Sequence, residues 1–427
     1  MSVINVMEFF IFFAMIPPFM YSIKYLKNHG INPLCIVSIV HFWAAGVPLV
    51  LGLVFVEPNY INMPGFYVAT KNTLVTVVYC FFVVGVSWLF WYMRGGENGA
   101  VVVSSLMEGM IKIKRYTFAL FALLLLPIFY FIFVPNSDVY AAYGMSIFHD
   151  FTEQELGFNA KLSLFTSISV VSFVLLSGLY RRNFILLLVV CSPVLMFDFW
   201  VNGKRAIVAT FVLLLFISDF VFGEKVKIKR LGVWGLVFLG FLLYSNWYQD
   251  SVRGLNEGFN SSEIKYQDFR VDYFRDQRIK MAVFAEVYPD EMRILEYRGQ
   301  SIIFLLTAPV ARDVWPDKPY PYAQYFTSAL YGVPPKLWGW GMTTSWLDEC
   351  ISNFGLIGLF IGPLSIIAFC RAGMKSRSPF LVMLTSLLGS LFLMLQAIAC
   401  MPLLIVWLGV IIFGSGRKVS VTGGKLR

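Results

Sequence analysis

Charged residues are scarce in this chain of 427 residues: Asp, Glu, Lys and Arg make up only 14% of it, against roughly a quarter in soluble domains. Apolar residues make up 58% and aromatic residues 17%. A water-soluble globule could not cover that much apolar surface, and a disordered chain would carry far more charge. The apolar residues form solid blocks and do not alternate with polar ones, which indicates membrane-spanning helices and argues against an outer-membrane barrel.

Histidine and cysteine, which often hold metals, are also few. The sequence has 3 histidines and 6 cysteines, and no two cysteines are spaced as CxxC. Most of the cysteines lie inside apolar runs, where cysteine acts as a small apolar residue, so we expect neither a zinc site nor a disulfide framework. The chain also lacks a P-loop and the G-x-S-x-G and H-E-x-x-H motifs, which excludes the enzyme classes that those motifs define.

The apolar blocks predict an all-α polytopic integral membrane protein with about eleven spans, or ten to twelve, since the last two nearly touch. Residues 1–247 form a transmembrane bundle of about eight helices, 248–350 a large polar loop, 351–413 the last transmembrane helices and 414–427 a basic tail. The predicted spans are Val6–Leu26, Pro33–Val56, Thr73–Met93, Tyr116–Val134, Lys161–Leu179, Phe184–Trp200, Arg205–Phe222, Leu231–Trp247, Ile351–Cys370, Pro379–Ala397 and Cys400–Phe413.

The basic residues predict the orientation of these spans. With the N-terminus outside, the inside loops and tail carry 19 Lys and Arg, whereas the short outside loops carry 4. Cytoplasmic loops are rich in Lys and Arg, so the C-terminus is expected inside. The net charge of +9 then reflects these loops and not nucleic-acid binding. The large loop lies outside and holds 11 basic and 14 acidic residues.

Three helices are predicted in the large loop, over about 262–287, 289–298 and 301–311. The last is expected to be a re-entrant or interfacial helix. Asp276 and Lys280 are spaced to pair along the first of them. The same helix carries Arg270, Arg275 and Arg278. Its basic face points either to solvent, as a salt-bridged surface, or to an anionic head group.

Three polar segments are candidate sites. Between Asp198 and Arg205, a turn at Asn202 and Gly203 places Lys204 and Arg205 at a helix start, where a phosphate would be favoured; binding to phospholipid phosphates is the simpler alternative. The second segment holds Arg312, Asp313 and Lys318 beside Trp315, which an interfacial anchor would also explain. The third holds Asp348 and Glu349 at the start of a span, as a general base or as ordinary helix N-terminal acids.

These segments resemble the Wzy-type O-antigen and oligosaccharide repeat-unit polymerases of the bacterial inner membrane. Gly203, Lys204 and Arg205 open a helix after an outside turn, as in that family. The stretch Pro309–Pro319 is similar to its "PR…WP.KP" segment, although two residues separate Pro309 from Arg312 here. Glu349 followed by Asn353, Phe354 and Gly355 completes the resemblance, and the large late loop fits along the whole chain.

The resemblance implies a GT-C-like glycosyltransferase whose active site faces the periplasm and whose substrates are undecaprenyl-pyrophosphate-linked oligosaccharides. It requires no cofactor, although a divalent cation would be compatible. Membrane lipid, a chain-length regulator and a flippase are the implied partners, and nucleic acid is not. Pyrophosphate would be bound by Lys204, Arg205, Arg312, Lys318, Arg270, Arg275 and Arg278. Glu349 is the preferred base, ahead of Asp348 and Asp313. Sugars would contact Trp315, Tyr322, Trp338, Trp340 and Asn353.

Two other functions stay open. An O-antigen ligase has a similar topology but is expected to carry a histidine in the large loop, which this chain lacks. A flippase or transporter of lipid-linked sugars would show internal repeats and paired broken helices.

Overall fold

In the computed structural model of the protein, every regular element among the described residues is a helix. The described residues are 3–55, 57–60, 62–95, 114–134, 137, 153–203, 205–222, 235–237, 239–241, 243–244, 247, 262–310, 312, 314–337, 341–375 and 378–414. Six helical stretches there are long and apolar enough to cross a membrane: Val6–His29, Pro33–Val54, Thr73–Tyr92, Gly157–Leu179, Arg181–Asn202 and Trp346–Met374. The prediction of a helical membrane protein is therefore confirmed in its class.

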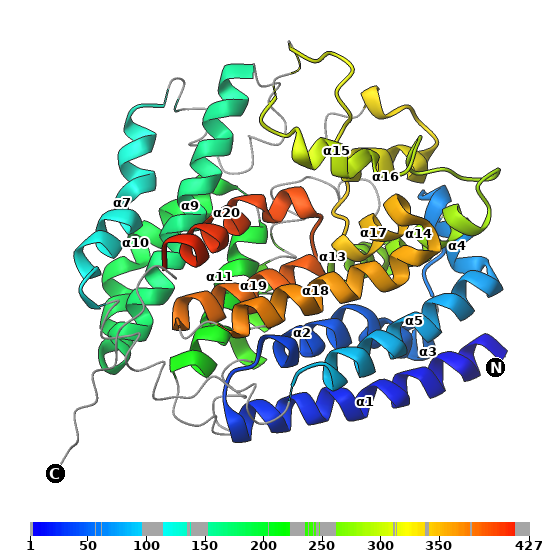
Figure 1. Ribbon diagram of the computed structural model, residues 1–427, viewed down its shortest axis with the longest axis horizontal. Coiled ribbons are helices and arrows are strands. Elements are labelled where there is room, and N and C mark those ends of the chain that lie inside the picture. Colours follow the sequence, from blue (N-terminus) through cyan, green and yellow to red (C-terminus); the bar gives the residue numbers. More distant parts are fainter. Residues whose placement is uncertain are drawn as a thin grey trace.

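One group of long helices lies side by side in Figure 1. It contains α1 (Val3–His29), α2 (Pro33–His41), α5 (Thr73–Tyr92) and α18 (Gly358–Met374). Helix α2 continues through a π-helical turn (Phe42–Gly46) into α3 (Val47–Val54). Asparagine starts two of these helices, because Asn32 Oδ1 accepts from the backbone N–H groups of Leu34 and Cys35 and Asn72 Oδ1 from that of Val75, which satisfies N–H groups that the helix itself cannot.

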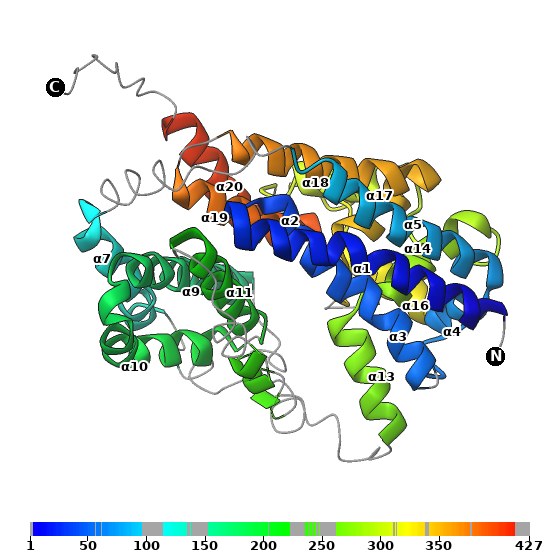
Figure 2. The same cartoon turned by 90° about the horizontal axis from the view of Figure 1, so that it is seen from below.

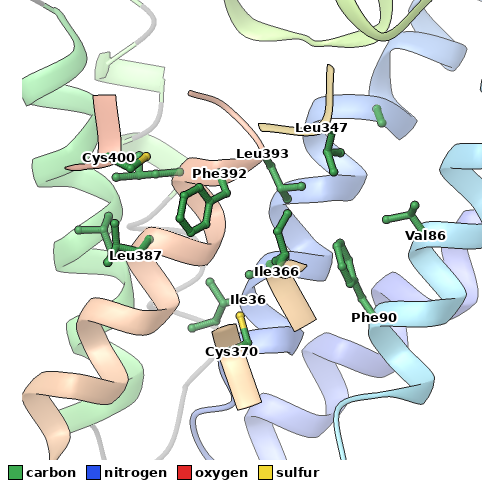
Figure 3. Packing of buried hydrophobic residues seen from close by; sticks show 14 of the residues in the cluster. Ile36, Val86, Phe90, Leu347, Ile366, Cys370, Leu387, Phe392, Leu393 and Cys400 are labelled. Carbon is green, nitrogen blue, oxygen red and sulfur yellow. The ribbon is translucent and has the colours of Figure 1, made fainter. Parts of the chain in front are cut away.

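A second group consists of α7 (Thr117–Ile132), α9 (Glu153–Leu179), α10 (Phe184–Asn202) and α11 (Arg205–Phe222). Figure 2 shows it beside the first group. Helix α11 contacts α19 (Pro379–Phe392), which packs on α2 and on α20 (Ala397–Gly414). The apolar core lies along these contacts, and it brings Ile36 of α2 together with Cys370 of α18 and with Leu387 and Phe392 of α19 (Figure 3). In lipid, the hydrophobic effect does not drive helices together, so van der Waals packing of this kind holds them in contact.

A third group gathers the polar segments around one buried helix. That helix is α14 (Asp276–Val287), which packs on α4 (Pro64–Lys71), α5 and α17 (Trp346–Phe354). Helix α13 (Ser262–Tyr273) precedes it, and α15 (Gln300–Leu306) and α16 (Tyr322–Tyr331) complete the group. Helices α14 and α17 therefore connect the polar segment of the sequence to the apolar bundle.

The prediction of one helix over 262–287 is wrong at a single point, where α13 ends and α14 begins. The backbone N–H of Arg275 donates to Ala44 O at 3.1 Å, so it does not bond to the carbonyl four residues before it. The π-helical turn thus accepts a bond that would otherwise continue the helix. The remaining residues of the predicted helix are helical.

The predicted helix over 289–298 is also wrong, because these residues form turns and bends. The backbone N–H of Glu296 donates to the side-chain oxygen of Gln300 at 2.9 Å, and such a local side-chain bond competes with helix formation. Gly299, with φ of +79°, then starts α15, which confirms a short helix there but ends it at Leu306. Helix α16 was not predicted at all.

The predicted spans agree with the described helices at most positions. Val6–Leu26, Thr73–Met93 and Arg205–Phe222 coincide with α1, α5 and α11 within a few residues. The span expected to begin at Ile351 instead begins at Trp346, with a break at Gly355 between α17 and α18. Eight of the 17 residues of Leu231–Trp247 and nearly all of the tail 414–427 lie outside the described residues.

Candidate functional site

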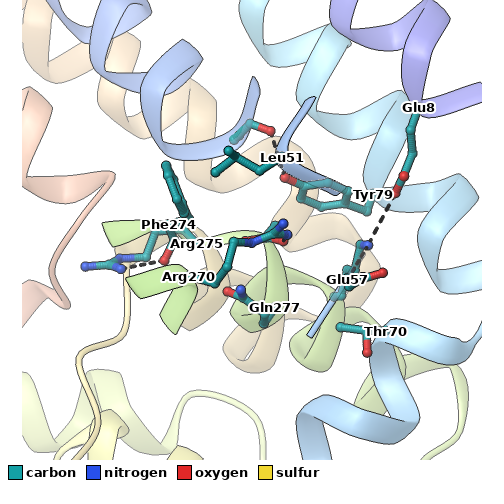
Figure 4. Close-up of polar contacts among 12 residues, drawn as sticks. Glu8, Leu51, Glu57, Thr70, Tyr79, Arg270, Phe274, Arg275 and Gln277 are labelled. Atoms are coloured by element: carbon teal, nitrogen blue, oxygen red, sulfur yellow. Dashed lines mark hydrogen bonds and ion pairs between the residues drawn. The ribbon is translucent and has the colours of Figure 1, made fainter. Parts of the chain in front are cut away.

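Charged side chains gather inside the protein where α13 and α14 meet the first helical group (Figure 4). Arg270, Arg275, Arg278 and Lys280 are only 2%, 4%, 1% and 2% exposed. The side chains point into the protein, so the interpretation of this basic face as a solvated surface is wrong. The interpretation as a face that binds an anionic head group stays a prediction. Buried charges are costly unless they are paired, so their partners define the site.

Arg270 pairs with Asp276 across the break between α13 and α14, with 2.5 Å between Nη2 and Oδ2. Its Nη1 donates to Tyr266 OH at 3.2 Å, and that hydroxyl donates to Leu51 O at 3.2 Å. Burial lowers the pKa of Arg270, but Asp276 and the neighbouring tyrosines outweigh burial and raise it above its ordinary value. The Arg270 guanidinium is therefore charged, and Asp276 and Tyr266 hold it in place.

Lys280 lies between two carboxylates, 3.6 Å from Glu8 Oε1 and 3.8 Å from Glu57 Oε1. The predicted pair of Asp276 with Lys280 is wrong, because Asp276 faces Arg270. Burial lowers the pKa of Lys280, but the charges of Glu57, Glu8 and Asp276 raise it by more. The pKa of Lys280 is therefore above its usual value. The lysine thereby connects α14 to α1 and to the segment before α4, a role that spacing along one helix could not reveal.

Arg278 is the least paired of the three arginines. Its Nη1 donates to Phe274 O at 2.9 Å, and its Nε has no acceptor among the described residues. Burial lowers the pKa of Arg278, and Asp348, Asp272 and Asp276 oppose that shift. Arginine stays charged in proteins, so Arg278 is a buried cation with a free donor.

Asp348 lies on α17, which packs against α14, the helix that carries Arg278. Its Oδ1 accepts from the backbone N–H and the hydroxyl of Ser345, which forms a capping box at the helix start. Its Oδ2 has no donor among the described residues. Arg278 and Arg275 interact with this carboxylate electrostatically. Arg278 and Asp348 thus lie on two helices in contact, α14 and α17, and each has a buried polar atom without a partner among the described residues.

Glu349, the preferred base, has no such free atom. Ser301 Oγ donates to its Oε1 at 2.8 Å and the backbone N–H of Ala397 donates to its Oε2 at 2.9 Å. Asn353 donates from Nδ2 to Ser301 Oγ and to Glu349 O, both at 2.7 Å. Glu349 and Asn353 therefore fasten α15, α17 and the start of α20 together, which explains both residues without a ligand.

Arg312 and Lys318 lie in the loop between α15 and α16, and each donates two hydrogen bonds to backbone carbonyls. Arg312 donates to Lys318 O at 2.7 Å and to Pro319 O at 3.0 Å, with its guanidinium 4.1 Å from the centre of the Tyr320 ring. Lys318 Nζ donates to Ala308 O at 3.0 Å and Val310 O at 2.8 Å. Burial lowers the pKa of Lys318, and Arg312 adds to the shift. The two cations hold the loop in its shape.

Among the remaining predicted residues, the structure describes Tyr322, Trp315, Gly203 and the backbone of Arg205. Tyr322 is buried, and its hydroxyl donates to Asp348 O at 3.0 Å, so it supports α17 and offers no open face for a sugar. Trp315 is half-buried. Gly203 is left-handed with φ of +61° and α11 begins at Arg205, which confirms the predicted turn. Lys204, Asp313, Trp338, Trp340 and the side chain of Arg205 lie outside the described residues.

The sequence analysis did not identify Glu8, Glu57 and Gln277, which lie with Arg270, Asp276 and Lys280 in the polar region around α13 and α14. Gln277 donates from Nε2 to Tyr60 OH at 2.6 Å. Glu8 was the one available signal, since an acid inside an apolar span needs a partner. No group of His, Cys, Asp and Glu within the described parts of the chain could hold a metal ion.

Comparison with protein-family models, with curated proteins and with solved structures finds no match to this chain.

Proposed function

We propose that this chain is a membrane glycosyltransferase of GT-C-like architecture. It joins undecaprenyl-pyrophosphate-linked oligosaccharide repeat units into O-antigen or capsular polysaccharide at the periplasmic face of the bacterial inner membrane. The resemblance of residues 203–205, 309–319 and 349–355 to repeat-unit polymerases supports this proposal. The observation that carries it is the burial of Arg278 and Asp348 on the packed helices α14 and α17, each with a polar atom that has no partner among the described residues.

A cation and a carboxylate are the two groups that this transfer needs. The bond from the sugar to the lipid pyrophosphate breaks, and a bond from the sugar to the acceptor hydroxyl oxygen forms. Negative charge gathers on the leaving pyrophosphate, where Arg278 stabilises it, while the hydroxyl proton passes to Asp348 as general base. Because the pyrophosphate is already a good leaving group, no nucleotide is required.

The proposal assigns the base to Asp348 and not to Glu349, because both Glu349 oxygens already accept hydrogen bonds from the protein. Arg312 and Lys318 shape the loop beside the site through their carbonyl contacts. The phosphate contact that the sequence predicts at Lys204 and Arg205 is the proposed second contact, for the other lipid-linked substrate.

Complementation of a strain deleted for this gene tests the proposal. Wild-type protein should restore a ladder of polysaccharide lengths on extracted lipopolysaccharide, and the empty strain should show core with a single repeat unit. Asp348→Asn and Arg278→Gln should lose the ladder while the protein remains in the membrane. Arg293→Ala is the matched control, since Arg293 is exposed.

Each other outcome leads to a different conclusion. A deletion strain without any sugar on the core would favour a ligase-like transferase or a flippase of lipid-linked oligosaccharides. If wild type restores the ladder and Asp348→Asn does so equally, the polymerase proposal stands and the assigned base is wrong.

A further inference from the structure

A polar seam runs between α9 and α10, two helices that are long and apolar enough to cross a membrane. Asp198 of α10 is completely buried in it. Asn202, one turn later, donates from Nδ2 to Thr166 Oγ1 at 2.7 Å and to Ser163 Oγ at 3.3 Å. Ser163, Thr166 and Ser169 recur every third residue of α9 and therefore lie along one side of it. The proposed glycosyl transfer makes no use of this seam.

The hydrogen bonds of the Ser169 hydroxyl indicate that Asp198 is protonated. The Ser169 hydroxyl oxygen lies 2.8 Å from Leu124 O, on α7, and 2.5 Å from Asp198 Oδ2. A hydroxyl has one hydrogen, and a backbone carbonyl can only accept. Both contacts are hydrogen bonds only if Ser169 donates to Leu124 and Asp198 donates its own proton to Ser169.

Among the residues that the structure describes, no cation compensates a negative charge at this position. The titratable side chains described on the surrounding helices are Tyr130 of α7, Glu155 and Lys161 of α9, Cys191 of α10 and Asp219 of α11, which pairs with Arg181 at 3.1 Å. None of them interacts electrostatically with Asp198, whose environment consists of burial and the Ser169 hydroxyl. A carboxylate without a counter-ion is strongly disfavoured at such a place, whereas a neutral carboxyl is not.

We propose that Asp198 is a proton-binding site inside this helical group and that its ligand is a hydrogen ion. Its Oδ1 has no partner among the described residues and stays available to a transferred proton. Thr166, Asn202 and the half-buried Ser163 extend from the site toward the end of α10. They supply the hydroxyl and amide groups through which the proton exchanges with solution. This site is independent of the proposed polymerase activity.

Infrared difference spectroscopy of the purified protein in lipid tests the proposal. The spectrum of wild type minus Asp198→Asn should contain the C=O stretch of a protonated carboxyl, shifted in D2O. Carboxylate bands in its place would show that Asp198 is ionised and would overturn the proposal. Asp198→Asn keeps a donor toward Ser169 and is expected to fold.

Two further variants separate a proton site from a silent structural carboxyl. Ser169→Ala removes the acceptor of the carboxyl proton and should move the same C=O band to higher frequency, which provides the test if Asp198→Asn does not fold. Thr166→Val keeps the side-chain shape and should slow the exchange of this band in D2O without removing it. An exchange rate equal to that of wild type would overturn the proposed route.

Discussion

Arg275 holds the backbone oxygen of Met394 with two donors, Nε at 3.1 Å and Nη2 at 3.0 Å, although 119 residues separate the two in sequence. Met394 lies in the turn between α19 and α20. The backbone N–H of Arg275 also donates to Ala44 O in the π-helical turn. One residue thus joins the break before α14 to the π-helical turn and to the turn between α19 and α20.

We expect Arg275→Lys to destabilise the protein, because an ammonium group cannot reproduce the two-pronged contact of the planar guanidinium. Loss of hydrogen bonds from a buried charged donor costs about 1–3 kcal/mol. Thermal unfolding of the purified protein in detergent measures the effect, and Arg293→Lys, at an exposed position, should unfold like wild type. Equal unfolding of both variants would mean that Met394 O is satisfied without Arg275.

The long apolar helices could be predicted from the sequence because their cause is local. A run of about 20 apolar residues has few alternatives to a helix in or near a membrane. The turn at Gly203 was equally local, since glycine readily adopts a positive φ. Helix positions within the polar segment were predicted less well, because contacts from elsewhere decide them: Ala44 O ends the helix before Arg275, and Gln300 prevents one at Glu296.

The candidate site, too, could be predicted only where its features depend on local sequence. Asp348 and Glu349 were found from their position at the start of an apolar segment, but their different roles depend on Ser301, Ala397 and Arg278, which lie 48, 48 and 70 residues away. The charge of the arginines was visible in the sequence, whereas their burial was not, because a helix surrounded by protein on all sides looks like a polar surface helix when its partners are unknown.

Lys280→Met should strongly destabilise the protein. It leaves Glu8 and Glu57 without the cation that lies 3.6 and 3.8 Å from them, and removal of one partner of a buried ion pair typically costs about 3–5 kcal/mol. Combining it with Glu8→Gln and Glu57→Gln should recover part of the loss. Thermal unfolding measures all variants, with Lys336→Met at an exposed position as control. A triple variant less stable than Lys280→Met would contradict this reading.

Arg312→Ala should loosen the loop between α15 and α16 and leave the rest of the fold intact. It frees Lys318 O and Pro319 O, and removes the guanidinium from the face of Tyr320, an interaction worth roughly 0.5–2 kcal/mol by itself. Limited proteolysis should cut the variant faster between residues 307 and 321 than wild type. Asp317→Ala, at an exposed position of the same loop, is the control. Cleavage at an unchanged rate would show that Lys318 alone holds the loop.

Glu349→Gln and Glu349→Ala should differ in stability far more than in any effect on chemistry. In Glu349→Gln, the amide oxygen can accept from the Ala397 N–H and the amide nitrogen can donate to Ser301 Oγ, so all three helices stay joined. In Glu349→Ala, Ser301 and Ala397 lose their acceptor, and each buried donor left unsatisfied costs about 1–3 kcal/mol. We therefore expect a clearly lower unfolding temperature for Glu349→Ala and a normal polysaccharide ladder for Glu349→Gln. A fully stable Glu349→Gln that has lost the ladder would return the role of base to Glu349.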